Sequence, residues 1–308
     1  MSLRIIEDGS IGKVERGPRV VLPPVGGYFA ERAARFEQLA TGNVLAAYLQ
    51  LMARVARAQH RALAARQADP PAATVLEQSR MHGMPPLAAL SHRRAAQWCE
   101  DLSDIVQGLR AEAAGSHTAA LDALTQLDHA AVEAVADRIL SGHTLDGDAA
   151  FVPFVGAALQ VYFARMAATL ASADVDQCDV ATVCPVCGTR PVASVVRIGP
   201  GRESLRYLHC ALCDTEWNMV RVKCSACESE KSVHYLSVDS EMRVATEAVV
   251  KAETCDECHG YLKIFNQERD PHVDAMADDL ATLALDVSVD EHGYVRTGPN
   301  LLFHPGSG

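Results

Sequence analysis

The chain lacks any long apolar run that is free of charge. Its longest apolar stretch, residues 149–173, contains Gln160 and Arg165. A membrane-spanning helix would place Arg165 near the middle of the bilayer, at a cost of about 2.5 kcal/mol or more. We therefore expect this stretch to form a buried helix of a soluble domain, without insertion into a membrane.

The opening residues do not predict a secretory leader either. Arg4, Glu7 and Asp8 occupy the place of the apolar core that a leader needs. We expect a cytoplasmic location, where disulfides rarely persist. The formal net charge of −11 discourages non-specific binding to nucleic acid and to anionic membrane surfaces.

Motifs of common enzymes are absent too. The sequence contains no recognisable nucleophile motif, phosphate-binding loop or dinucleotide fingerprint, and Gly199-Pro-Gly201 is typical of a turn. The sequence therefore favours a non-catalytic protein and assigns no catalytic residue.

Aromatic residues make up only 5% of the chain, whereas Ala and Leu are frequent, and this composition favours helices. Helical periodicity recurs through residues 28–173, which predicts a bundle of five to seven helices. Residues 1–27 are expected to be an irregular lead-in. Residues 69–86 contain two Pro-Pro pairs and are expected to form a loop with little regular structure.

Cysteine is concentrated in one quarter of the chain, as four Cys-x-x-Cys pairs. The pairs are Cys184/Cys187, Cys210/Cys213, Cys224/Cys227 and Cys255/Cys258. A spacing of two residues lets both thiolates of a tight turn face one ion, and two such turns make a closed tetrahedral cage. In a cytoplasmic chain the pattern predicts two metal ions rather than disulfides.

The gaps between the pairs suggest which of them cooperate. Twenty-two residues separate the first pair from the second, and twenty-seven separate the third from the fourth, enough for a small antiparallel ribbon in each case. We predict one ion within the first two pairs and one within the last two. A cross-braced arrangement, first pair with third and second with fourth, is the alternative.

The residues around the pairs are typical of metal-binding turns joined by strands. Gly188 and Gly260 follow a second cysteine, where a positive φ costs glycine little. The β-branched and aromatic runs at residues 192–197, 205–208, 233–238 and 261–265 predict short strands. Around Pro271 a new element begins, and apolar residues at helical spacing predict a C-terminal helix before a loop-like tail from Asp286.

Polar and aromatic neighbours of the cysteines have modest expected roles. His209 and His259 are expected at the surface or beside a sulfur, not as ligands. Four acidic residues are expected to be solvated turn residues, namely Asp214, Glu216, Asp256 and Glu257. Four aromatic residues are expected to pack the ribbons, namely Tyr207, Trp217, Tyr235 and Tyr261. Cys99 and Cys178 lie outside the pairs and are expected to be structural thiols, with Cys99 in the helical core.

Several runs resemble the FdhE family of formate dehydrogenase accessory proteins. The cysteine half contributes Cys184-Pro-Val-Cys-Gly, the run from Leu205 to Trp217, Arg221-Val-Lys-Cys-Ser-Ala-Cys, the run from Lys251 to Lys263, and Ala277-Asp-Asp-Leu-Ala. The front half contributes Arg32-Ala-Ala-Arg-Phe-Glu-Gln-Leu-Ala and Tyr48-Leu-Gln-Leu. The resemblance covers nearly the whole chain, and all four cysteine pairs follow the family pattern.

This resemblance implies a cytoplasmic maturation factor that contacts the catalytic subunit of respiratory formate dehydrogenase before export. It also implies rubredoxin-like iron at the cysteine pairs. Four thiolates bind iron and zinc alike, so zinc is the alternative. Two other functions stay open from the residues, namely a thiol or iron redox protein acting on the dehydrogenase, and a nucleic-acid-binding zinc ribbon, which the acidic charge disfavours.

Together these patterns predict an α+β protein with four parts. A helical domain spans residues 1–173, and a first ribbon of rubredoxin or zinc-ribbon type spans residues 174–222. A second ribbon spans residues 223–268, and residues 269–308 form the C-terminal helix and tail.

Overall fold

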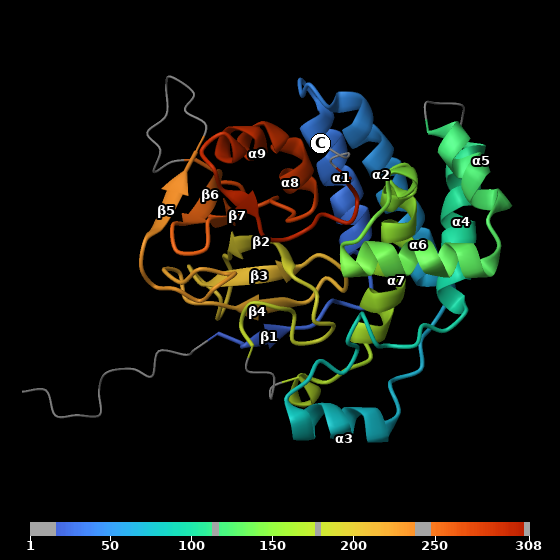
Figure 1. Ribbon diagram of the computed structural model, residues 1–308, viewed down its shortest axis with the longest axis horizontal. Helices are drawn as coiled ribbons and strands as arrows, with labels where there is room; N and C mark the ends of the chain where they lie inside the picture. The colour runs from blue at the N-terminus through green and yellow to red at the C-terminus, as the bar shows by residue number, and fades with distance from the viewer. Residues whose placement is uncertain (1–16, 113–116, 176–179, 238–247, 305–308) are drawn as a thin grey trace, which may run out of the picture.

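The computed structural model describes residues 17–112, 117–175, 180–237 and 248–304. Figure 1 shows a group of helices on one side and a β-sheet on the other, with the C-terminal helices α8 (Ala277–Ala281) and α9 (Leu283–Asp290) packed above the sheet. This arrangement is the predicted α+β fold, with helices first in the chain and the cysteine-rich sheet after them.

The helical part agrees with the predicted bundle. Within the described residues, seven α-helices precede the second strand. They are α1 (Tyr28–Ala40), α2 (Ala46–Ala65), α3 (Ala73–His82), α4 (Gln97–Ala111), α5 (Thr118–Gln126), α6 (His129–Ser141) and α7 (Val152–Ala167). Two short 3-10 turns, Asp146–Asp148 and Ser172–Asp174, flank α7.

Helix α3 corrects the prediction of a loop at residues 69–86. The prolines stand outside it, and Gly83 ends it in the left-handed conformation with φ 61°. Among its ten residues only Ser79 is buried, so α3 has no apolar stripe that a periodicity search would detect. The sequence did contain a weaker indication of this helix, because residues that favour helices, such as Ala, Leu, Glu and Gln, lie between the two Pro-Pro pairs.

Helix α7 is buried on all sides, as expected for the longest apolar stretch. Its charged residue, Arg165, donates two hydrogen bonds of 2.8 Å to the carboxylate of the fully buried Asp101 on α4. This pairing offsets the cost of burying both charges. No helix in the described part of the chain combines the length and the apolar character needed to cross a bilayer.

A single sheet unites the cysteine-rich half. Its strands are β1 (Val20–Val21), β2 (Pro191–Val196), β3 (Arg206–Cys210), β4 (Glu216–Asn218), β5 (Val233–Leu236), β6 (Val250–Cys255), β7 (Gly260–Asn266) and β8 (Val295–Arg296). Their order is β1-β4-β3-β2-β7-β6-β5, with β8 beside β7. The two predicted ribbons are thus β2-β3-β4 and β5-β6-β7, and the parallel pair β2–β7 joins them.

Both chain ends contribute strands that the sequence did not reveal. Strand β1, inside the expected irregular lead-in, pairs antiparallel with β4. The predicted C-terminal helix is divided into α8 (Ala277–Ala281) and α9 (Leu283–Asp290), so that helix extends past Asp286, where a loop-like tail was expected. Strand β8 then pairs parallel with β7.

The C-terminal segment packs tightly on α7. A Cβ added to Gly156, in the middle of α7, would lie 2.0 Å from the carbonyl oxygen of Leu301. Gly156→Ala is therefore expected to reduce the free energy of unfolding by about 1–3 kcal/mol, because neither the helix nor the Leu301 backbone can move freely. Urea unfolding measures this loss.

Gly108→Ala in α4 is the matched control. The added Cβ would meet only the flexible end of Arg61 at 3.0 Å, and alanine is the better helix former. This variant is expected to be unchanged or up to about 1 kcal/mol more stable. Equal losses for the two variants would contradict the close approach of Leu301.

Candidate metal centres

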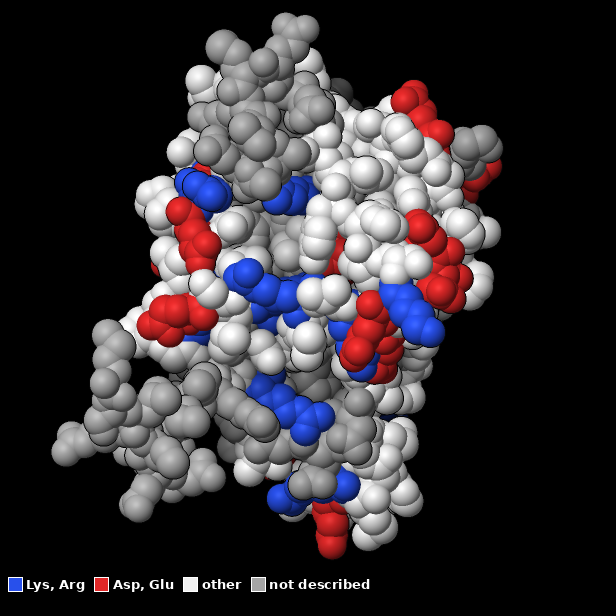
Figure 2. Space-filling view, turned by 90° about the vertical axis from the view of Figure 1, so that its left-hand side faces the viewer, with Lys and Arg blue, Asp and Glu red and all other residues white. Residues whose placement is uncertain are grey.

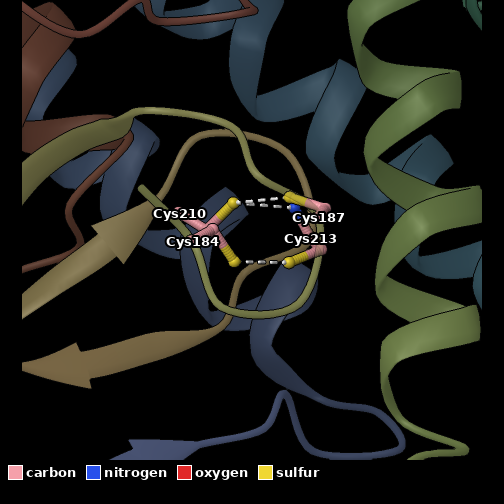
Figure 3. A group of neighbouring side chains, drawn as sticks. All are labelled: Cys184, Cys187, Cys210 and Cys213. Carbon is pink, nitrogen blue, oxygen red and sulfur yellow. Dashed lines mark hydrogen bonds between the residues drawn. The ribbon is translucent and has the colours of Figure 1, made fainter. Parts of the chain in front are cut away.

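The first cluster consists of Cys184, Cys187, Cys210 and Cys213, and its sulfurs converge on one point between two turns. One turn precedes β2, and the other joins β3 to β4. The Sγ atoms of Cys184 and Cys213 are 3.5 Å apart, and those of Cys187 and Cys210 are 3.4 Å apart (Figure 3). All four sulfurs lie within 4.8 Å of one another.

The second cluster consists of Cys224, Cys227, Cys255 and Cys258. Its Sγ atoms are 3.8 Å apart between Cys224 and Cys258, and 3.7 Å apart between Cys227 and Cys255. A tetrahedral ion with sulfur bonds of about 2.3 Å has sulfur–sulfur edges of about 3.8 Å. The donor set and the spacing in both clusters therefore fit a four-thiolate metal site.

The grouping follows the predicted order, first pair with second and third with fourth. The cross-braced alternative would need first-pair and third-pair sulfurs in one group, and the structure places them in separate groups. That each cluster binds an ion stays a prediction.

Every cysteine turn has a left-handed residue directly after its second cysteine. These residues are Gly188, Asp214, Glu228 and His259, with φ of 75°, 60°, 62° and 53°. The sequence suggested glycine for this role and assigned it to Gly260 in the last turn, which is wrong. A Cβ on Gly260 would instead lie 2.5 Å from the Thr297 side chain, so this glycine serves close packing. The non-glycine residues accept a strained conformation that four converging sulfurs require.

Backbone N–H groups point at the sulfurs. The amides of Val186 and Leu212 donate to Cys184 and Cys210 at 3.4 and 3.3 Å, and Ala226 donates to Cys224 at 3.4 Å. Such bonds favour the thiolate, which is the form that ligates a metal. The same loop geometry recurs in both clusters, so both are arranged for anionic sulfur.

Burial works against ionisation in the first cluster. It raises the pKa of the Cys184 and Cys210 thiols well above their usual value, with the neighbouring cysteines adding to the shift of Cys210. A cation at the centre would oppose this effect, because metal binding displaces the thiol protons. Burial acts on Cys187 as well, but hydrogen bonds from its neighbours lower its pKa, so one thiolate is stabilised by the cluster itself. Four thiolates together would need a positive ion at the centre.

The two clusters differ most in exposure. All four cysteines of the first cluster are buried, whereas Cys227 and Cys258 of the second are exposed. The backbone of residues 87–89 covers the first turn, since Leu87 donates to the Val186 carbonyl at 2.9 Å. On the other turn, Gln160 of α7 donates to the Ala211 carbonyl at 2.8 Å. Figure 3 shows α7 running beside the cluster.

A buried ion-pair network ties helix α1 to the first cluster. Arg32 is 1% exposed and contacts the carboxylates of Asp214 at 2.6 Å and Asp274 at 3.1 Å. His209 Nε2 lies 2.9 Å from Asp214. Burial raises the pKa of Asp214, but Arg32 and His209 together lower it below the usual range. Asp214 is thus a partly buried, paired anion with a side chain only 12% exposed, not the solvated turn residue that the sequence suggested.

Sequence reasoning missed Arg32 as a part of this site. The arginine falls on the same face of α1 as the buried Phe29 and Phe36. A charged residue within an apolar stripe was the available signal, because such a residue needs a buried partner. The sequence alone could not identify Asp214 and Asp274 as those partners.

A cavity of about 570 Å³ opens beside this network, where α1, the β3–β4 turn and residues 267–275 meet. Charged side chains of both signs line it, including Arg35, Arg197 and Glu216. Nδ1 of His209 is buried and has no hydrogen-bond partner in the described part of the chain. A group bound in the cavity would lie next to Asp214 and the turn that carries Cys213.

The aromatic residues that were expected to pack the sheet, and the acidic residue Glu216, agree only in part with the predictions. Tyr207, Trp217 and Tyr261 are buried and pack the sheet as expected, whereas Tyr235 is exposed. Glu216 is not solvated, because Arg197 binds it with two hydrogen bonds of 2.8 and 2.6 Å.

The acidic residues of the last cysteine turn are exposed as expected. Asp256 and Glu257 both lie at the surface, where Asp256 accepts a hydrogen bond from Tyr294 at 2.7 Å. Cys99 is half-buried rather than a core residue, and Cys178 lies outside the described residues.

Comparison with known proteins finds one family along the chain. The model described as "FdhE, N-terminal" matches residues 17–179, the FdhE central domain matches residues 183–221, and the FdhE C-terminal domain matches residues 222–303. These three matches include both cysteine clusters and the helices that cover the first.

Individual proteins agree with the family match. A Protein FdhE homolog of Pseudomonas aeruginosa is 42% identical over 311 residues, and Protein FdhE of Escherichia coli is 36% identical over 314 residues. These alignments cover 99% or more of this chain and of each relative. The crystal structure of the FdhE protein from Pseudomonas aeruginosa, 41% identical, superposes with a TM-score of 0.84 over 94% of this chain and 100% of that one.

Proposed function

The chain belongs to the FdhE family, and on this premise we propose that it is a cytoplasmic accessory protein that binds the catalytic subunit of formate dehydrogenase before export. The protein is non-catalytic in this proposal and acts by holding its client during maturation. The observation that supports it most is the family match over the whole chain, together with the two four-cysteine clusters in one fold.

The eight cysteines would hold two metal ions, one in each cluster. We favour iron, as the family resemblance implies, with zinc as the alternative, because four thiolates accept both. Iron in such a site supplies one-electron redox chemistry, whereas zinc supplies structure alone. The chain's own contribution is to orient the sulfurs, donate N–H bonds to them and exclude water from the first cluster.

The charge distribution suits a protein client better than a nucleic acid. Figure 2 shows Lys and Arg side chains near the middle of one face, with Asp and Glu on both sides of them. The mixed sign of this face and the net charge of −11 disfavour binding to the phosphates of a nucleic acid.

Capture of the client tests the proposal. The tagged full-length protein, expressed with the catalytic subunit of formate dehydrogenase, is expected to retain that subunit through purification. A different exported metalloenzyme subunit, expressed in the same way, is the control and is expected to pass through. Equal retention of both proteins, or of neither, would contradict the proposed function.

Exposure of the second cluster favours one further candidate, a redox role toward the dehydrogenase. Cys227 and Cys258 are exposed, so an electron or a client thiol could reach this cluster directly. The test is the visible spectrum of protein purified without oxygen. A band that bleaches reversibly with dithionite supports the redox role, and a colourless zinc protein excludes its iron form.

A further inference from the structure

A third group of ligand-type side chains lies outside the two clusters, between helices α4 and α6. Cys99 projects from α4, and His129 and Glu133 lie one turn apart on α6. Their ligand atoms all lie within 4.8 Å of one another. We propose that these three side chains form a third metal site, which takes a zinc-like divalent ion and leaves a fourth position open.

The chemistry of the three donors suits such an ion. A thiolate, an imidazole and a carboxylate are all zinc ligands, and sites with three protein ligands keep a fourth position for water or substrate. The His129 and Glu133 atoms are 4.0 Å apart, and the His129 side chain is 64% exposed. The exposed imidazole can therefore turn toward the ion without rearranging the bundle.

Glu133 is held in place by residues that do not themselves bind the ion. Trp98 Nε1 donates to Glu133 Oε1 at 2.7 Å, and Arg94 Nε donates to Glu133 Oε2 at 3.1 Å. Hydrogen bonds to a ligand carboxylate fix its direction in metal sites. Glu133 Oε1 accepts one hydrogen bond from Trp98 and has a second lone pair that can bind the ion.

The charge balance permits a cation despite the nearby arginine. Arg94 divides its charge between Glu133, whose Oε2 accepts hydrogen bonds from Nε and Nη2, and Asp137, whose Oδ1 lies 2.6 Å from Nη2. Burial raises the pKa of the Cys99 thiol to about 11, so Cys99 gives up its proton only when a cation binds. The resulting thiolate and Glu133 then contribute two negative charges next to an exposed imidazole. This differs from an ordinary His–Glu pair on a helix surface, because a thiol from a second helix completes the set.

The experiment uses the full-length protein with both clusters loaded, and the probe is Zn²⁺ alone. Equilibrium dialysis against buffered zinc, followed by elemental analysis, is expected to add one equivalent to the wild type. His129→Ala is expected to lose this equivalent and to keep the others. His82→Ala, at an exposed histidine on α3, is the matched control and is expected to bind as the wild type does.

A second measurement identifies the sulfur ligand. Co²⁺ added to the loaded wild type is expected to give a thiolate-to-cobalt charge-transfer band, which Cys99→Ser removes. The proposal is overturned if His129→Ala binds as much zinc as the wild type. It is also overturned if the added cobalt shows no such band. His129 is exposed, so its variant keeps the test valid even where Cys99→Ser fails to fold.

Discussion

Replacing Cys184 by serine is expected to remove the ion of the first cluster and to prevent the protein from accumulating in a folded form. The cluster is buried, and Cys184 is 0% exposed. Structural zinc binding contributes about 10–16 kcal/mol at neutral pH, which matches or exceeds the whole stability of about 5–15 kcal/mol of a typical domain. Soluble yield and metal content of the purified protein measure the loss.

Cys258→Ser in the second cluster is the matched control. Cys258 is exposed, and its cluster lies at the surface rather than under helix α7. This variant is expected to lose one ion while the helical part and the first cluster stay folded. Full metal content in Cys184→Ser, or an equal loss of yield in both variants, would contradict the structural role of the first cluster.

Replacing Arg32 by methionine is expected to reduce the free energy of unfolding by about 3–5 kcal/mol, because Asp214 and Asp274 would lose the buried partner they share. Methionine keeps most of the side-chain volume, so the loss reports the charge rather than a cavity. The contact links α1 to the turn that holds Cys213, so lower metal retention is expected as well. Urea unfolding and elemental analysis measure the two effects.

Arg57→Met on the neighbouring helix α2 is the control. Arg57 pairs with Glu37 at the surface, where the side chains are 41% and 56% exposed. Exposed pairs contribute little, so this change is expected to stay within about 1 kcal/mol. Similar losses in the two variants would mean that the buried network does not hold α1 to the first cluster.

The local pattern was sufficient to predict the cysteine grouping and most elements around it. Two residues between cysteines fix the turn, and the long gaps leave room for a ribbon within each half. Helix α7 was predictable for a similar reason, because a run that is apolar on all sides must be buried.

Contacts between distant segments could not be predicted in this way. The parallel pairing of β2 with β7 joins residues about seventy positions apart, and no local periodicity encodes it. The same holds for Arg32 with Asp214 and Asp274, since a lone buried arginine does not identify its partners. Helix α3 was not predicted for a different reason. It buries only one residue, so its sequence has no stripe of apolar residues at helical spacing.

Elemental analysis of the full-length protein, purified without oxygen and dialysed against a chelator, tests whether the eight paired cysteines hold two metal ions. Two tightly held ions per chain are expected in the wild type, and one in Cys258→Ser. Wild-type protein that is folded yet free of metal, or whose eight paired cysteines are joined as disulfides, would contradict this expectation.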